Sequence, residues 1–203
     1  MSESKHKPYA DSCLRNQQAI LDTLKLYFQR DAARCFELGS GTGQHAVFVT
    51  KHCPYIEWQP SDLPECIAGI QAWVDDAACN NLLSPLAYDV NAEVLIEAPK
   101  YDYVFTANTL HYVSETTGGN KLRVASQALV KQGMLFIYGP FNDAGAFTSE
   151  GNRHLNDWLL QRDPESGVRD IQWVKTLAAE LGLVFRKDYE MPANNLMLAF
   201  EKD

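Results

Sequence analysis

Cysteine is scarce and scattered in this sequence. The chain of 203 residues contains five cysteines, an odd number, and no C-x-x-C pair. This spacing indicates neither a disulfide framework nor a zinc cluster. We therefore expect reduced structural thiols at Cys13, Cys35, Cys53, Cys66 and Cys79.

Excess positive charge and long apolar runs are also missing. The 18 Lys and Arg residues are outnumbered by 26 Asp and Glu residues, which gives a net charge of −8 and a pI near 5.1. This balance disfavours nucleic acid and anionic membranes as partners. Residues 1–7 are polar, and no apolar run suits a signal peptide or a membrane span, so we expect a cytoplasmic protein. The sequence does not indicate an oligomeric state.

The most informative residues present are three alternate glycines after a short apolar run, in the stretch FELGSGTGQ at residues 36–44. Alternate glycines let the backbone turn tightly and approach a ligand, while the helix that follows directs free N–H groups at it. Gln44 stands where the third glycine of G-x-G-x-x-G belongs, and no Tyr-x-x-x-Lys pair is present, which disfavours a nicotinamide oxidoreductase. A glycine-rich turn without a ligand is the simpler alternative.

Asp62 lies about 20 residues beyond the glycines, at the end of an apolar stretch. A carboxylate at this strand end is placed to accept both hydroxyls of a ribose. A surface aspartate beside a turn is the alternative. Pro60 lacks the N–H of a central strand, so we expect pairing to finish before it or to leave the missing N–H at the strand's end.

The order of helical and strand patterns predicts one domain, 1–203, with a doubly wound α/β fold. Its sheet is mostly parallel and closes with an antiparallel hairpin. The strands that we expect are residues 34–38, 56–61, 86–90, 101–108, 134–138, 184–189 and 196–200. The helices that we expect are residues 14–28, 46–51, 65–78, 121–131 (with Gly133 near its stop) and 170–181; the first, within residues 1–30, is placed to cover a cofactor.

This layout of seven strands resembles the Rossmann-like class I S-adenosylmethionine (SAM) methyltransferases over nearly the whole chain. Five separated motifs, in order, are similar to those of the domain of unknown function 938 family. They are residues 37–45, EWQPSD at 57–62, YGPF at 138–141, GVRD at 167–170 and MPANN at 191–195. The resemblance implies SAM as cofactor and S-adenosylhomocysteine (SAH) as product.

The class I pattern also implies a set of cofactor-binding residues. Glu37 and the backbone of Gly39, Ser40, Gly41 and Gly43 would hold the methionine end. Asp62 would accept the ribose hydroxyls, Asp89 and the N–H of Val90 would meet the adenine, and Asn108 would stand beside the methionine moiety. Asp89 is also a plausible turn residue, and Asn108 a plausible cap.

His111 is the best candidate for the proton acceptor, because it follows the fourth strand and has an ordinary pKa near neutrality. Tyr138 and Tyr112 are its alternatives, and a packed, hydrogen-bonded histidine is the competing interpretation of His111. No Asn/Asp-Pro-Pro-aromatic segment follows the fourth strand, which disfavours base-amine methylation. No carboxylate cluster follows it either, so we expect no metal.

We expect the long segment 141–169 to be a lid and substrate insertion. The residues expected to contact substrate are Tyr112, Phe141, Arg169, Asn194 and Asn195. Arg169 would clamp an anion or pair with Asp170, and the two asparagines would reach over the site or form a turn. The sequence therefore predicts methyl transfer to the oxygen or nitrogen of a small molecule. The alternative is a SAM-binding sensor or interaction module without turnover.

Overall fold

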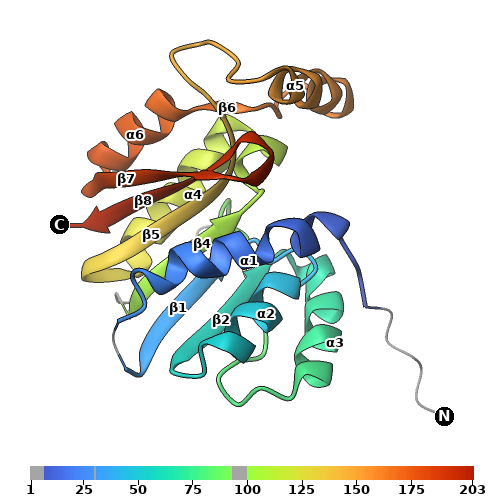
Figure 1. The fold of residues 1–203 in the computed structure, drawn as a ribbon, viewed down its shortest axis with the longest axis vertical. Coiled ribbons are helices and arrows are strands. Elements are labelled where there is room, and N and C mark those ends of the chain that lie inside the picture. Colours follow the sequence, from blue (N-terminus) through green and yellow to red (C-terminus); the bar gives the residue numbers. More distant parts are fainter. Residues whose placement is uncertain (1–6, 30, 93–99) are drawn as a thin grey trace.

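The computed structural model describes residues 7–29, 31–92 and 100–203, which form one mixed β-sheet with helices on both faces (Figure 1). The strand order is β3-β2-β1-β4-β5-β8-β7, with a short β6 beside the end of β5. β1 to β5 pair in parallel, whereas β8 runs antiparallel to both β5 and β7. This arrangement confirms the predicted fold class. The strands are β1 (Ala33–Leu38), β2 (Ile56–Asp62), β3 (Leu86–Ala87), β4 (Tyr101–Ala107), β5 (Leu129–Asn142), β6 (Arg169–Asp170), β7 (Leu183–Met191) and β8 (Asn195–Lys202).

The helices divide between the two faces of the sheet (Figure 1). Helices α1 (Asp11–Lys25), α2 (Gln44–His52) and α3 (Ile67–Ala77) cover one face, and α4 (Glu115–Ala128) and α6 (Ile171–Glu180) cover the other. Helix α5 (Glu150–Arg162) lies apart from both groups, at the top of the view in Figure 1. Three short 3₁₀ turns complete the described elements: η1 (Pro64–Cys66), η2 (Leu110–Tyr112) and η3 (Pro192–Asn194).

Alternation along the strands supplies a hydrophobic core on each face. In β1, Cys35 faces the cluster built with α1 and α2, whereas Phe36 and Leu38 face the cluster built with α4 and α6. Because the inner strands are covered on both sides, consecutive residues are buried at their centres, as at 35–38 of β1 and 103–106 of β4. The carboxyl ends of the parallel strands remain open and converge at one edge of the sheet.

Two predicted helices differ from the structure by three or more residues at each end. Helix α4 begins at Glu115 rather than at residue 121, because Ser114 caps it by accepting the N–H of Thr117 at 3.2 Å. Its last residue is Ala128, and Gly133 lies inside β5 instead of marking a helix stop. Helix α1 begins at Asp11 and ends at Lys25, three residues earlier at each end than predicted.

The strands differ from the prediction at three places. β3 contains two residues instead of five, because Asp89 accepts the N–H of Asn91 at 2.9 Å and turns the chain. β5 spans 14 residues, since β4 and β8 pair along its two sides. Pairing continues through Pro60, which lies opposite Glu37. Trp58 donates its N–H to the carbonyl of Asn81, on the side of β2 that faces away from β1. Backbone N–H groups point to alternate sides along a strand, so the nitrogen of Pro60, two residues later, faces the same side. β3 pairs there only from Ser61 onwards, so no ladder hydrogen bond is lost at the proline.

Within the described ranges, no helix is long and apolar enough to cross a lipid bilayer. The five cysteines are free thiols, and Cys13, Cys35 and Cys53 are buried.

Candidate functional site

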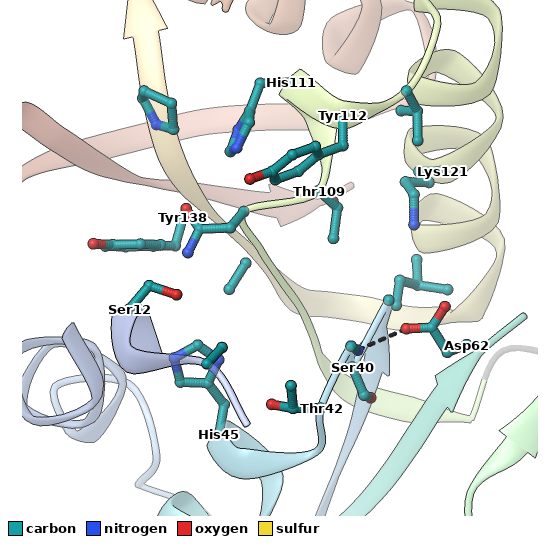
Figure 2. A pocket seen from close by; sticks show the side chains of 18 of the residues that line it. Ser12, Ser40, Thr42, His45, Asp62, Thr109, His111, Tyr112, Lys121 and Tyr138 are labelled. Atoms are coloured by element: carbon teal, nitrogen blue, oxygen red, sulfur yellow. Dashed lines mark hydrogen bonds between the residues drawn. The ribbon is translucent and has the colours of Figure 1, made fainter. Parts of the chain in front are cut away.

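A cavity of about 1050 Å³ opens at the carboxyl ends of β1, β2 and β4 (Figure 2). The first turns of α1 form one wall, the turn after β3 and the start of α4 form another, and residues of α5 and η3 complete it. This volume is at the upper end of the range for small-molecule sites. It leaves room for more than one ligand.

The glycine loop between β1 and α2 forms the floor of the cavity. Gly39, Gly41 and Gly43 all have positive φ angles, of 82°, 57° and 85°, in the left-handed region that favours glycine. A Cβ on Gly39 would come within 2.8 Å of Thr109 Cγ2, so this position also lacks space for a side chain. Gly39, Ser40 and Gly41 line the cavity, whereas Gly43 packs against Ile70 below it.

Glu37 is buried at the end of β1, beneath the loop. Its Oε2 accepts hydrogen bonds from Trp58 Nε1 at 3.0 Å and from Ser40 Oγ at 2.8 Å. Burial raises the pKa of Glu37 to about 7, although both hydrogen bonds oppose the rise. The carboxyl group therefore supports the loop from below and changes its charge near neutral pH.

Asp62 is held in place by two backbone donors at the end of β2. Gly41 donates its N–H to Oδ2 at 2.6 Å, which is dashed in Figure 2, and Leu63 donates to Oδ1 at 2.8 Å. The carboxylate lines the cavity and keeps further acceptor capacity on both oxygens. Its orientation is thus set before any ligand is bound.

Asp89, Val90 and Asn108 also line the cavity, from the turn after β3 and the end of β4. Asp89 closes the turn to Asn91, as its alternative interpretation predicted, and still faces the cavity. Asn108 adopts a φ of 54° and donates its N–H to the carbonyl of Tyr138 at 2.8 Å.

His111 lies in η2, on the opposite side of the cavity from Asp62 (Figure 2). Its side chain is buried, with 5% of the residue exposed, and its ring lies 4.5 Å from that of Tyr112. Within the described part of the chain, neither ring nitrogen forms a hydrogen bond. Burial, and secondarily the charge of Arg169, lower the pKa of His111 to about 4, so the ring is neutral at pH 7.

Tyr138 is the centre of a polar cluster on the same side of the cavity. Asn195 donates its Nδ2–H to the tyrosine hydroxyl at 3.0 Å, and the amide of Asn16 approaches the same hydroxyl. Asn16 Oδ1 in turn lies 2.8 Å from His45 Nε2. Burial raises the pKa of Tyr138 and lowers that of His45 to about 4, so both side chains are neutral at pH 7.

Three of the residues expected to contact substrate do not line the cavity. Phe141 is buried in the core beside α6, and Asn194 lies in η3 with a φ of 56°. Arg169 contacts neither the cavity nor the carboxylate of Asp170 that was its other predicted partner, since Asp170 caps α6 instead. The remaining two, Tyr112 and Asn195, line the cavity.

Arg169 binds the turn that carries His111. Its guanidinium donates to the carbonyls of Leu110 at 3.3 Å and of Val113, and it lies 3.8 Å from Glu115. Two residues earlier, the N–H of Gly167 donates to the carbonyl of His111 itself at 2.9 Å. The segment that follows α5 therefore fixes η2 through backbone contacts.

A family model described as a protein of unknown function, DUF938, matches residues 7–202. The chain belongs to this family.

Solved methyltransferase structures share the fold of this DUF938 chain. An O-methyltransferase family protein from Burkholderia thailandensis has a TM-score of 0.82 at 15% identity, over 95% of this chain and 58% of its own. A family 2 O-methyltransferase from Planctomyces limnophilus, in complex with apigenin, has a TM-score of 0.74 at 14% identity, over 92% of this chain and 62% of its own. A structure of PigF with SAH has a TM-score of 0.72 at 15% identity, over 92% and 66%. The chain thus spans less than two thirds of each of these proteins, and the likeness establishes the class I methyltransferase fold.

Several residues of the DUF938 site were not predicted from the sequence. Asn16 carried a signal, because a polar residue stands at helical spacing from Ile20 and Leu24 on the apolar face of α1. Lys121 carried none, since lysine on a helix is ordinarily solvated. The others line the cavity through contacts between distant segments: Ser12, Cys13, Arg15, Thr42, His45 and Thr109.

Among the residues that the structure describes, no group of three or more His, Cys, Asp or Glu side chains is arranged to hold a metal ion.

Proposed function

We propose that this protein binds SAM in the cavity and transfers its methyl group to an oxygen or nitrogen atom of a small molecule. One arrangement carries the proposal. A glycine loop with three left-handed residues, the buried Glu37 beneath it and the oriented carboxylate of Asp62 meet at the carboxyl ends of two neighbouring parallel strands. The shared fold with methyltransferases, one of them solved with SAH, supports this assignment.

The residues at the loop suit the groups of SAM. The bare backbone of Gly39 and Gly41 lines the cavity together with Ser40 and admits the methionine end. Glu37 does not line the cavity; it lies beneath the loop, where it accepts a hydrogen bond from the hydroxyl of Ser40, and from there it would hold the amine. Asp62 would accept the ribose hydroxyls. Asp89 and the N–H of Val90 would meet the adenine, and Asn108 would lie beside the methionine portion.

SAM supplies an activated methyl group with a neutral leaving group, so the protein contributes mainly positioning and exclusion of water. His111 is neutral at pH 7 and both its ring nitrogens are without partners among the described residues, so it can accept a proton from an acceptor hydroxyl or ammonium. Tyr138 contributes a hydroxyl that Asn195 holds in place. In this assignment His111 accepts the proton that the methyl acceptor loses, and the hydroxyl of Tyr138 orients the methyl acceptor.

The acceptor would enter between α1, η2 and the segment 141–169. Tyr112 and Asn195 line this part of the cavity, together with Asn152 and Leu155 of α5, which supports a lid role for that segment. Residues of α1, including Ser12 and Asn16, line the opposite wall and support a covering role for the N-terminal helix; residues 1–6 and 30 of the predicted segment lie outside the described ranges. The related Planctomyces enzyme was solved with apigenin, which favours a small-molecule acceptor here.

Thermal unfolding with SAM, SAH or NAD tests the cofactor assignment, because a ligand that binds only the native state raises Tm. We expect shifts with SAM and SAH that disappear in Asp62→Ala. Asp188→Ala, an exposed change of the same charge, is the matched control and should keep both shifts. No shift with SAM or SAH would contradict the proposal, and a shift with NAD alone would replace it.

Turnover separates this proposal from a SAM-binding sensor without catalysis. SAH formation from SAM would be followed in the presence of a library of phenols, carboxylic acids and amines. An enzyme should form SAH with one acceptor class and lose this activity in His111→Ala while keeping SAH binding. Binding of SAM with no product from any acceptor would favour the sensor.

A further inference from the structure

Lys121 reaches the cavity from α4, through the gap above the glycine loop (Figure 2). Its Nζ lies 3.1 Å from the point that a Cβ on Gly39 would occupy, beside the methyl group of Thr109. In Figure 2 the ammonium points toward the side of the cavity where Asp62 lies. The residue is half-buried, and this burial lowers the pKa of its ammonium.

The ammonium has no direct partner in the part of the chain that the structure describes, where it forms no hydrogen bond and no ion pair within 4.0 Å. Its nearest favourable charges are Asp62 and Asp89, which act on it from a longer distance. Both carboxylates already accept backbone N–H groups, from Gly41 and Leu63 and from Asn91. Lys121 is half-buried and lines the cavity, so its free donors face the space that a ligand would fill.

The charges around Lys121 indicate which end of a ligand it faces. Figure 2 shows the ammonium directed toward Asp62, the carboxylate assigned to the ribose, and the charges that favour its protonated form are those of Asp62 and of Asp89, which is assigned to the adenine. These two acids satisfy the donors of a nucleoside, namely its hydroxyls and exocyclic amine. The ring nitrogens and ribose oxygens are acceptors and require donors.

We propose that Lys121 donates a hydrogen bond to an acceptor atom in the nucleoside half of the bound cofactor. The inference rests on the proposed function, since it concerns the same ligand. It makes Lys121 a further cofactor-binding residue and assigns adenosine recognition to α4 as well as to the strand ends. The required ligand chemistry is an adenosine with its ring and ribose acceptors intact, whatever its 5′ substituent.

Binding of three ligands to Lys121→Met tests this placement by calorimetry. SAM and SAH contain the amino-acid end, and 5′-methylthioadenosine lacks it. We expect Lys121→Met to weaken binding of all three by a similar factor, about 10- to 100-fold, because each loses a charged hydrogen bond. Lys51→Met, an exposed change of the same kind on α2, should leave all three affinities unchanged.

Two results would overturn the inference. Unchanged affinity for all three ligands would show that the ammonium does not contact them. A loss confined to SAM and SAH would place it on the methionine carboxylate instead. Wild-type protein that binds none of the three would reject the proposed function itself, and the inference with it.

Folding of the variant is checked by its Tm without ligand, which we expect to be no lower than that of wild type because a half-buried charge is removed. Lys121→Gln is the second variant, since it keeps an N–H donor without the charge. It should bind 5′-methylthioadenosine with an affinity between those of wild type and Lys121→Met.

Discussion

The two halves of the cavity are built in different ways. The loop half consists of residues 39–42, Asp62, Asp89 and Lys121, with Glu37 buried beneath the loop, and it contains two carboxylates and an ammonium. The tyrosine half consists of Asn16, His111, Tyr138 and Asn195, whose side chains are uncharged at pH 7. The loop half comes mainly from the ends of three adjacent strands, whereas the tyrosine half joins α1, η2, β5 and β8. Backbone geometry therefore defines the first half, and long-range side-chain packing defines the second.

The largest expected effect tests whether backbone geometry controls the loop half. Gly39→Ala adds a clash with Thr109 to its left-handed strain and should lower the free energy of unfolding by about 3 kcal/mol or more. Gly41→Ala is the matched control, because its φ is also positive but no atom lies within 4 Å of the added Cβ. It should lose only about 1–2 kcal/mol in urea denaturation. Equal losses of stability in the two variants would show that backbone strain accounts for the whole effect and that the clash with Thr109 adds nothing.

Glu37→Gln tests whether charge in the loop half opposes stability. The native pKa of about 7 lies above the ordinary 4.5, so the contribution of Glu37 to stability is fully present below pH 4.5 and is lost as pH rises through 7. Gln retains an oxygen for the donors Trp58 and Ser40, both of which contact one carboxyl oxygen. At pH 8 the variant should be more stable by about 2–3 kcal/mol, measured by urea denaturation.

The same variant should bind SAM more weakly, since an amide replaces an acceptor oxygen at the methionine end. Glu180→Gln, exposed at the end of α6, is the control and should change neither property. If Glu37→Gln were less stable than wild type at pH 8, burial of the charged carboxylate would not be destabilising, which would contradict this prediction.

Asn16→Ala tests whether packed amides define the tyrosine half. It leaves the imidazole of His45 without its hydrogen-bond partner and removes a polar neighbour of Tyr138, which should reduce stability by about 1–3 kcal/mol. Gln17→Ala, on the adjacent position of α1, should change it by less than about 0.5 kcal/mol. Thermal or urea unfolding at pH 7 measures both. If Asn16→Ala left the stability unchanged, the contacts of Asn16 with His45 and Tyr138 would not be what defines the tyrosine half.

The smallest effect concerns the acid–base state of His111. An NMR titration should show a pKa near 4, and Arg169→Met should raise it by an amount well short of its return to 6.5, because burial is the larger cause. The low native pKa means that stability is present above pH 6.5 and is lost as pH falls towards 4. Arg153→Met, an exposed change on α5, should leave the titration unchanged. A pKa of 6.5 in wild type would show that the His111 ring is solvated, which would contradict its burial in the structure.

The sequence named residues in both halves, but only in the loop half did it display the physical reason for them. Alternate glycines and an acid about 20 residues later report local backbone requirements, which the sequence displays directly. Asn16 and Asn195 meet Tyr138 only because β8 inserts beside β5 and α1 packs across the sheet, and no local pattern encodes that meeting. Arg169 was predicted to face a ligand, yet its side-chain direction depends on the turn that it binds. The fold class was predictable, whereas the length of β5 and the start of α4 depended on pairing and capping partners.

The meeting of Asn16 and Asn195 at Tyr138 also orders events during folding. As the chain leaves the ribosome, the segments that supply the glycine loop and Asp62 emerge well before β8. The tyrosine half must wait until β8 has paired with β5 and brought Asn195 to Tyr138, where Asn16, from a distant part of the sequence, meets the same hydroxyl. The residues of the first half are therefore synthesised before the second half can be completed by β8.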